Sequence, residues 1–337
     1  MLLHKHSPNS LSCNLILSPA LMVLIGNLFP LLLLSFLFVQ YSCMFQLVQS
    51  FNNFTDQSAL IAFKSRFNSS PNETLLATNW SAPNSICNWI GVSCNRRRQR
   101  VTALDLSYMG LQGTISPHIG NLSFLVSLHL SNNSFFGFIP QEISHLHRLR
   151  ILILSFNQLE GSIPPSIQNC QKLHTVSFDT NRLIGAIPSS FGNLSKLKDL
   201  NLQYNSLTGP LPPFIFNISS LNIVAVTSNH ILGAIPNDLC SHCPNLRGLY
   251  FSFNELDGQL HSQFNNCGEL LILSLAYNKL DGSISKALIS NLQKLEELYL
   301  GTNNFTGIIP STIHNLSRLQ LFAIEDNHIQ GSIPTNL

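Results

Sequence analysis

Charged residues are scarce in this chain of 337 residues: Asp, Glu, Lys and Arg together make up only 10%. Soluble domains usually carry about a quarter, so charge alone does not explain how this chain would stay in solution. Long apolar runs are also missing beyond the N-terminal region, where no uncharged stretch of about 18 apolar residues occurs. The sequence therefore predicts no membrane-spanning segment downstream of its start.

Patterns of catalytic residues are missing as well. Twelve histidines are scattered without the spacing of metal ligands. No Ser/His/Asp or paired-carboxylate arrangement can be assembled from the repeated positions, and no phosphate-binding loop or kinase motif occurs. We therefore expect no catalytic residue, no metal and no cofactor, and we do not expect the chain to be an enzyme.

Acceptor sequences for N-linked glycans are plentiful. Ten sites of the type Asn, any residue except Pro, then Ser or Thr are present. Glycans at such sites would supply the hydration that the scarce charges do not. The sites begin at Asn53, Asn68, Asn72, Asn79, Asn121, Asn132, Asn193, Asn217, Asn304 and Asn315.

Glycosylation requires export, and the N-terminus has the pattern of a signal peptide. The run from Leu28 to Val39 is almost wholly apolar and follows a weakly basic start. Pro19 and Pro30 interrupt the longer apolar stretch, which disfavours a membrane-spanning helix. Cleavage after Ser50 fits the small-residue rule, although it leaves a long tail behind the apolar core, so the site stays open.

A repeat of 24 or 25 residues organises most of the chain. Asn recurs at this interval, and Gly follows each Asn after four residues. Self-similarity at such a period is typical of a solenoid. The Asn column consists of Asn133, Asn157, Asn181, Asn205, Asn229, Asn254, Asn278, Asn303 and Asn327, and the first repeat carries Met109 in its place.

Apolar residues alternate with polar ones just before each Asn, as Leu200 and Leu202 do in the fifth repeat. This alternation predicts one short strand per repeat, paired with its copies in a parallel sheet. We expect each ladder Asn to satisfy backbone groups of its own turn and of the neighbouring repeat. An Ile-Pro pair follows most of the glycines, and proline is expected to end the pairing there.

These columns resemble plant-type leucine-rich repeats, whose unit reads Leu-x-x-Leu-x-Leu-x-x-Asn-x-Leu-x-Gly-x-Ile-Pro. The resemblance spans about Val101 to Leu337. It implies an α/β solenoid, a right-handed superhelix with a concave parallel β-sheet and a helical, disulfide-containing N-terminal cap. The cap would start with a helix over Asp56 to Phe67, whose apolar face carries Ala59, Leu60 and Phe63.

The resemblance is closest to the immune-receptor group of plant receptor-like kinases, in which a membrane helix and a cytoplasmic Ser/Thr kinase follow the solenoid. We assign residues 1–50 to the signal peptide, 51–100 to the N-terminal cap and 101–337 to ten repeats without a C-terminal cap. Neither later part of such a receptor is in this sequence, so a fragment or partial gene product is favoured over a finished soluble protein.

Two of the eight cysteines, Cys13 and Cys43, lie in or beside the export segment. In an oxidising compartment the nearby pairs among the remaining six should be closed. Cys87 and Cys94 are predicted to form a disulfide.

Three further cysteines occupy a column that leucines hold in other repeats. Cys170, Cys243 and Cys267 are therefore interpreted as small buried apolar residues. The alternative is a disulfide between Cys243 and Cys267, because equivalent positions of adjacent repeats lie about one strand spacing apart.

The outward strand positions become apolar in repeats 6 to 10, where polar residues would be expected. Contiguous exposed apolar surface usually marks a binding site, and charged neighbours would suit a peptide with both apolar and charged groups. Lateral packing or covering glycans are the alternatives. The predicted ligand-binding residues are Ile223, Arg247, Tyr250, Ile272, Glu297, Tyr299 and Leu321.

Two basic groups and one aromatic column are interpreted without a function. The run from Arg96 to Arg100 is taken as a solvated loop, and a basic stripe at the strand entrance as solvated surface, with anion binding as the alternative. The aromatic residues that precede several ladder asparagines are taken as scaffold. The basic stripe comprises Arg150, His174, Lys198 and Arg247, and the aromatic column Tyr108, Phe156, Tyr204, Phe253 and Tyr277.

We expect a receptor-type domain, extracellular or on the outer face of the plasma membrane, that binds a peptide or protein on its concave face in defence or developmental signalling. The resemblance implies a co-receptor kinase as a further partner. The alternatives are a soluble apoplastic interaction or inhibitor protein, or a truncated product of a receptor Ser/Thr kinase gene. We do not expect the chain to bind nucleic acid. We expect it to associate with a membrane only through the N-terminal signal or a missing C-terminal segment.

Overall fold

The computed structural model describes residues 54–68, 76, 78–81, 85–237, 239–260 and 263–334. These residues belong to one compact unit that spans 52–337. The predicted signal peptide, its cleavage site and the sequons at Asn53 and Asn72 lie outside the described residues. No described helix is long and apolar enough to cross a bilayer.

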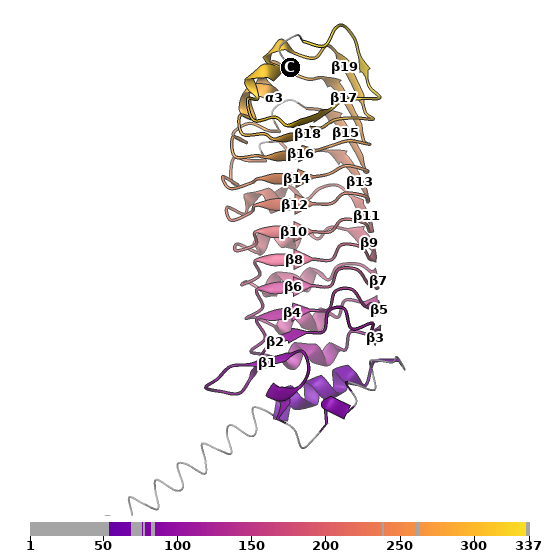
Figure 1. Ribbon diagram of the computed structural model, residues 1–337, viewed down its shortest axis with the longest axis vertical. Helices are drawn as coiled ribbons and strands as arrows, with labels where there is room; N and C mark the ends of the chain where they lie inside the picture. Colours follow the sequence, from indigo (N-terminus) through magenta and orange to yellow (C-terminus); the bar gives the residue numbers. More distant parts are fainter. Residues whose placement is uncertain are drawn as a thin grey trace, which may run out of the picture. The chain divides into compact units, whose positions relative to one another are not determined.

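The predicted solenoid is confirmed, and one short strand per repeat forms a parallel sheet of stacked turns (Figure 1). Strand β1 pairs antiparallel with β2 at the N-terminal edge, so the cap and the repeats share this first sheet. The other neighbours pair in parallel and in register, as Leu200 of β10 does with Val224 of β12. The sheet contains β1 (Val92–Cys94), β2 (Val101–Asp105), β4 (Ser127–His129), β6 (Ile151–Ile153), β8 (Thr175–Ser177), β10 (Asp199–Asn201), β12 (Ile223–Ala225), β14 (Gly248–Tyr250), β16 (Ile272–Ser274), β18 (Glu297–Tyr299) and β20 (Leu321–Ala323).

A second parallel sheet, which the sequence did not predict, runs along the adjoining flank (Figure 1). Its strands follow the ladder position, and those from β3 to β19 include the Gly of their repeat, which has a positive φ, for example φ +80° at Gly233. Each inner strand of this sheet pairs with the equivalent strands of the two adjacent repeats. The sheet contains β3 (Gln112–Thr114), β5 (Ser134–Phe138), β7 (Gln158–Gly161), β9 (Arg182–Ala186), β11 (Ser206–Gly209), β13 (His230–Ala234), β15 (Glu255–Gln259), β17 (Lys279–Ser283), β19 (Asn304–Gly307) and β21 (His328–Ile329).

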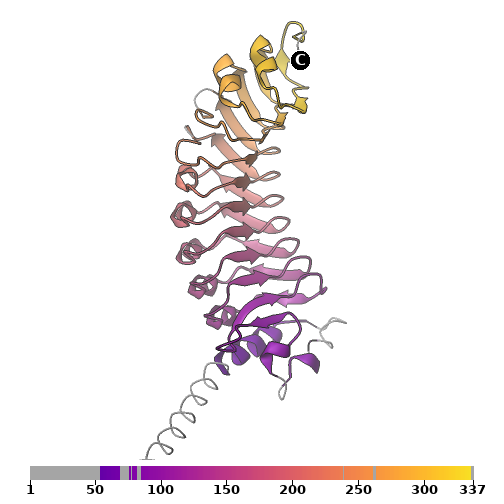
Figure 2. The ribbon, with the colours of Figure 1, turned by 60° about the vertical axis from the view of Figure 1, so that its left-hand side comes forward.

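Short helices cover the side of the stack away from the first sheet (Figure 2). Most are single 3-10 turns that begin directly after the proline, whose fixed φ suits the position before a helix. Ser285 replaces that proline in repeat 8, and its hydroxyl accepts a hydrogen bond from the Leu288 amide to start the α-helix α3. The helices are η1 (Ile86–Asn88), η2 (Pro117–Asn121), η3 (Gln141–His145), η4 (Pro165–Asn169), η5 (Ser189–Asn193), η6 (Pro213–Asn217), α3 (Lys286–Asn291) and η7 (Ser311–Asn315).

The asparagine ladder forms as expected. In repeat 6, Oδ1 of Asn229 accepts from the Leu207 amide, and its Nδ2 donates to the carbonyls of Leu202 and Val226. One side chain thus satisfies backbone groups of two consecutive repeats, which water cannot reach inside the stack. The same three kinds of bond recur at every ladder asparagine from Asn133 to Asn327.

The N-terminal cap closes the first repeat. Residues 54–64 are helical, and the predicted apolar face is buried. Phe67 lies beyond the helix and pairs with Gly113 of the second sheet. Trp80 stacks on Trp89 with ring centroids 5.4 Å apart, and Cys87 and Cys94 form the expected disulfide.

The alternative disulfide between Cys243 and Cys267 is wrong. Cys267 is bonded to Cys240, and the Cα atoms of this pair are 5.1 Å apart. Side chains in one column of a solenoid run parallel, whereas a disulfide needs Cβ vectors that converge. Cys243 and Cys170 are buried free thiols, in agreement with their interpretation as apolar residues, and burial raises their pKa to about 11 and about 12 respectively.

Candidate functional site

The register of the first sheet places the predicted ligand-binding residues in adjacent columns. Ile223, Gly248, Ile272, Glu297 and Leu321 follow one another across β12 to β20. Two residues further along each strand, the second column contains Ala225, Tyr250, Ser274, Tyr299 and Ala323. We call the surface formed by these two columns the bed.

Most bed residues are half-buried and present one side to solvent, while Leu321 is exposed. Gly248 and Ala225 are buried, and the short side chain of Ala225 between Asn201 and Tyr250 is only 3% exposed. An outward position on the strand therefore does not guarantee exposure.

Tyr250 lies flat along its own strand because Gly248 leaves room for its ring. A Cβ atom on Gly248 would lie 2.8 Å from Cε2 of Tyr250. Burial raises the pKa of the Tyr250 phenol, and the negative charge of Glu297 raises it further. The sequence analysis missed Gly248, although a glycine at an outward strand position was a visible signal.

Glu297 lies within the bed rather than at its border. Its Oε2 accepts a hydrogen bond of 2.9 Å from the hydroxyl of Tyr299 on the same strand. This bond, followed by burial and the carboxylate charge, raises the pKa of the Tyr299 phenol. Tyr299 thus donates to the carboxylate, and the charge of Glu297 raises the pKa of both phenols. We treat Tyr250, Glu297 and Tyr299 as one cluster.

Arg247 is exposed at the entrance edge of the bed, just before β14. It is close enough to Glu269 to lower the pKa of that carboxyl group, behind the larger effect of the hydrogen bond from Lys294. The opposite edge has small side chains, and at Gly301 the carboxylate of Glu325 occupies the space where a Cβ would be.

The aromatic residues before the ladder asparagines are exposed, and their interpretation as scaffold stays a prediction. Tyr108 is 78% exposed, and Phe253 stacks on Tyr277 at the rim of the bed with centroids 4.1 Å apart. Each adopts a left-handed backbone conformation, with φ between 52° and 58° across the column. The turn that precedes the Asn points these rings to solvent.

The concave face of repeats 3 to 5 has a different chemistry. Oδ1 of Asp179, which is only 8% exposed, accepts hydrogen bonds from Ser155, Ser177 and Asn201. Asn201 in turn accepts from the side chain of Gln203. Short polar side chains thus connect three neighbouring repeats, and we call this group the polar network.

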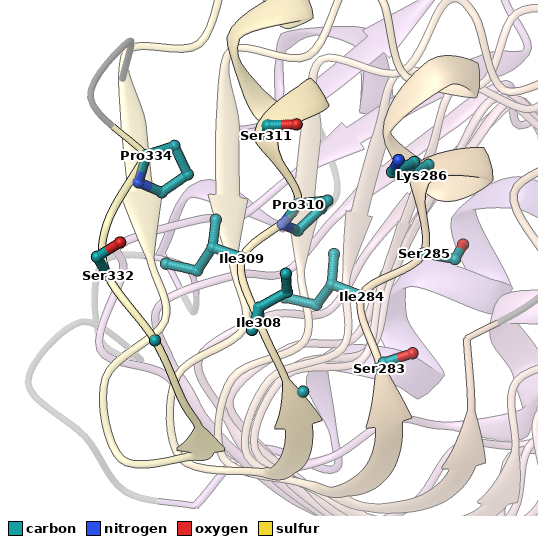
Figure 3. Close-up of a pocket in the computed structure, with 12 residues that line it drawn as sticks. Ser283, Ile284, Ser285, Lys286, Ile308, Ile309, Pro310, Ser311, Ser332 and Pro334 are labelled. Atoms are coloured by element: carbon teal, nitrogen blue, oxygen red, sulfur yellow. The ribbon is translucent and has the colours of Figure 1, made fainter.

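Two pockets lie outside the bed. One, of about 720 Å³, lies beyond the ends of the second-sheet strands. Ile284, Ile309 and Pro310 line it from consecutive turns (Figure 3). Another of about 690 Å³ is lined by prolines of repeats 4 to 6, including Pro188 and Pro212. The bed is an open surface, which suits an extended chain better than a small compact ligand.

No group of His, Cys, Asp and Glu in the described ranges could hold a metal ion. The acceptor asparagines that the structure describes lie at the surface, and Asn79 and Asn132 are half-buried. The exposed ones are Asn68, Asn121, Asn193, Asn217, Asn304 and Asn315.

Two family models match the chain. The leucine rich repeat N-terminal domain matches residues 54–95, and the leucine rich repeat matches residues 124–146, 148–170, 196–218 and 294–316. These ranges correspond to the cap and to four of the turns described above.

Plant receptor kinases are similar in sequence. The LRR receptor-like serine/threonine-protein kinase EFR of Arabidopsis thaliana is 49% identical over 100 residues, which cover 30% of this chain. That match covers only 10% of EFR, so the chain spans a small part of the length of such relatives.

Solved ectodomains of plant receptors share the fold. The ectodomain of GASSHO1/SCHENGEN3 from Arabidopsis thaliana, in complex with CASPARIAN STRIP INTEGRITY FACTOR 2, has a TM-score of 0.70 and 33% identity, covering 84% of this chain and 36% of that one. The Arabidopsis receptor kinase HAESA, in complex with the peptide hormone IDA and the co-receptor SERK1, has a TM-score of 0.58 and 27% identity, covering 81% and 54%.

Proposed function

We propose, on the premise that this chain is a leucine-rich-repeat protein of the plant receptor type, that its bed binds an extended peptide or protein segment outside the cell. The similar receptors include HAESA in complex with a peptide hormone. The observation that carries the proposal is the Tyr250, Glu297 and Tyr299 cluster, which lies among apolar side chains of the bed.

An extended peptide fits the geometry of the bed. Apolar side chains such as Ile272 and Leu321 would remove the ligand's apolar groups from water. The tyrosines offer large, rigid faces that lose little side-chain entropy on binding, which is why such residues dominate many interfaces. Glu297 holds a negative charge in partly desolvated surroundings and would favour a Lys, an Arg or a free amino group on the ligand.

The test selects peptides from a random displayed library on the full secreted chain and measures their affinity by biolayer interferometry. We expect the Tyr250→Ala/Tyr299→Ala double variant to bind at least about tenfold more weakly, because centrally placed interface tyrosines commonly contribute more than 1 kcal/mol each. Glu297→Gln should weaken basic peptides more than neutral ones.

Tyr204→Ala is the matched control. Tyr204 is an exposed aromatic residue of the fifth repeat, outside the bed, so its loss should leave the affinity unchanged. Peptides that bind the double variant as tightly as the unaltered chain would contradict the proposal, provided that both proteins unfold at the same temperature.

A co-receptor kinase that joins the ligand-bound solenoid is part of the proposal, by analogy with the HAESA complex. The signalling role would be in defence or development, and the chain would lie in the extracellular space or on the outer face of the plasma membrane. The alternative function is that of a soluble apoplastic interaction or inhibitor protein. If the chain is a receptor domain, addition of a selected peptide should increase its binding to a candidate co-receptor ectodomain. If it is a soluble interaction or inhibitor protein, the peptide should not change that binding.

A further inference from the structure

Three guanidinium groups surround one phenyl ring where the cap meets the second repeat. The ring belongs to Phe124, and its centroid is 4.2 Å from Cζ of Arg148, 4.5 Å from Cζ of Arg100 and 5.6 Å from Cζ of Arg98. Cation–π attraction holds such groups at an aromatic face. Without this attraction, three guanidinium charges gathered around one ring would repel one another.

Arg100 has a structural role. It is buried and donates two hydrogen bonds, of 2.7 and 2.8 Å, to the carboxylate of Asp56, and a third to the hydroxyl of Ser123. The interpretation of the whole run from Arg96 to Arg100 as a solvated loop is therefore wrong at its last residue. The pair with Asp56 anchors the loop between β1 and β2 to the helix of the cap.

Arg98 and Arg148 are different, because they are exposed and form no ion pair within the described ranges. The loop that carries Arg98 is held in place by Asn95, whose Oδ1 accepts from the amides of Arg97 and Arg98. Two guanidinium groups are therefore positioned on one ring with donors available to a ligand.

These side chains line a pocket of about 330 Å³ without a single acidic residue. A planar guanidinium presents paired N–H donors that match the two oxygens of a carboxylate. The lining residues are Asn95, Arg97, Arg98, Thr102, Phe124, Val126 and Arg148.

The positive charge continues beyond the pocket along the entrance edge of the first sheet. The positions equivalent to Phe124 and Val126 are basic in repeats 3 to 5, so basic side chains recur at the strand spacing of about 4.8 Å. Asp199 is an acidic residue next to this edge. Burial raises the pKa of its carboxyl group, and the positive charge of Lys198 partly offsets that rise. We call this surface the basic strip, and its residues are Arg148, Arg150, Lys172, His174, Lys196 and Lys198.

The acceptor sites for glycans leave the middle of the strip open. Asn121 and Asn193 end the 3-10 turns η2 and η5, three residues before the column that contains Phe124. In the two turns between them the same position holds His145 and Asn169, and neither begins an acceptor sequence. Glycans would therefore flank the strip without covering Arg148 and Lys172.

We propose that the pocket and the basic strip bind a linear acidic polysaccharide with one carboxylate on each sugar residue. Such a polymer repeats its charge at a regular interval, as the strip does, whereas the acidic groups of a peptide follow its sequence. The pocket would receive the carboxylate of one sugar between Arg98 and Arg148, and the strip would follow the next ones. This site is separate from the bed, so it does not depend on the proposed peptide ligand.

The test measures binding of oligogalacturonate to the full secreted chain by isothermal titration calorimetry at low and at physiological salt. We expect binding that weakens with added salt, and an affinity at least about tenfold lower for Arg98→Ala/Arg148→Ala, because two charge-assisted pairs are lost. Arg148→Lys keeps the positive charge but lacks the paired N–H donors of a guanidinium. Its affinity for oligogalacturonate should therefore lie between those of the unaltered chain and the double variant. Arg182→Ala removes an exposed arginine of the second sheet and should bind like the unaltered chain.

Three results would overturn the proposal. The first is an equal affinity of the double variant and the unaltered chain for oligogalacturonate. The second is that polyglutamate binds as tightly as oligogalacturonate. The third is that the chain binds inorganic phosphate but not oligogalacturonate. Arg98 and Arg148 are exposed, so the double variant should fold, and an unchanged melting temperature checks this. A failure here would leave peptide binding to the bed intact.

Discussion

The two halves of the concave face share one backbone and differ in chemistry. Repeats 3 to 5 carry the polar network around Asp179 and the basic strip, whose side chains form no ion pair among the described residues. Repeats 6 to 10 carry the tyrosines and aliphatic residues of the bed, and there Lys279 and Lys294 are in ion pairs. The buried leucines are equivalent in both halves. A solenoid can therefore change its surface from one repeat to the next without altering the core that holds the repeats together.

The largest expected effect tests whether the halves share one core. Cys170 and Cys243 lie in the same buried column, one in each half. With pKa values of about 12 and about 11, both should react with iodoacetamide at least about a hundredfold more slowly than an exposed thiol. Both should become reactive at the same urea concentration, as followed by mass spectrometry. Exposure of one thiol well before the other would mean that the halves unfold separately.

Loss of the carboxylate of Asp179 should break the polar half. Asp179→Ala leaves the donors of Ser155, Ser177 and Asn201 without their acceptor in a buried place. We expect a loss of about 3 kcal/mol in the free energy of unfolding, measured in urea. Ser274→Ala in the bed removes a single hydrogen bond to Ser252 and should cost about 1 kcal/mol. Equal losses for the two variants would contradict the difference between the halves.

A methyl group at Gly248 should distort the bed alone. In Gly248→Ala the new Cβ meets the Tyr250 ring at 2.8 Å, so the ring must move outward, at a cost of about 1 kcal/mol. Because burial is the main cause of the raised pKa of Tyr250, that pKa should fall toward its ordinary value. Absorbance of the phenolate during an alkaline titration measures this shift.

Gly268→Ala is the control for that titration, since no atom lies within 4 Å of the Cβ position at Gly268. This variant should leave both the stability and the phenol titration unchanged. A Tyr250 pKa that is the same in both variants would show that Gly248 does not position the ring.

The smallest expected effect concerns the hydrogen bond between Tyr299 and Glu297. Glu297→Gln weakens the hydrogen bond that is the main cause of the raised pKa of Tyr299, and it removes the carboxylate charge that adds to this effect, so the phenol should titrate at lower pH. Since folding raises this pKa, the bound proton adds stability below the ordinary tyrosine value, and the contribution is lost as pH rises through the raised value. The variant should therefore lose less stability between neutral and alkaline pH. An unchanged phenol titration would argue against the bond.

Much of the fold could be predicted from the sequence because the same pattern around a ladder asparagine occurs nine times. The spacing of the asparagines predicts the stack, and the register of the strands follows from it. The second sheet was missed because its strands carry no alternation of their own beyond a Leu and a Gly. The bed residues were found from their positions on the strands, while Ala225 shows that an outward position does not guarantee exposure.

The solenoid, the asparagine ladder and the columns of the concave face can all be predicted from the amino-acid sequence, since they depend on one short period. Three contacts become known only from the folded chain. Cys240, not Cys243, joins Cys267, Tyr250 lies over Gly248, and two exposed arginines meet on the ring of Phe124. Each of these depends on the direction in which a side chain leaves the backbone. A repeat fixes the place of a residue but not that direction, which its neighbours in adjacent turns determine by packing.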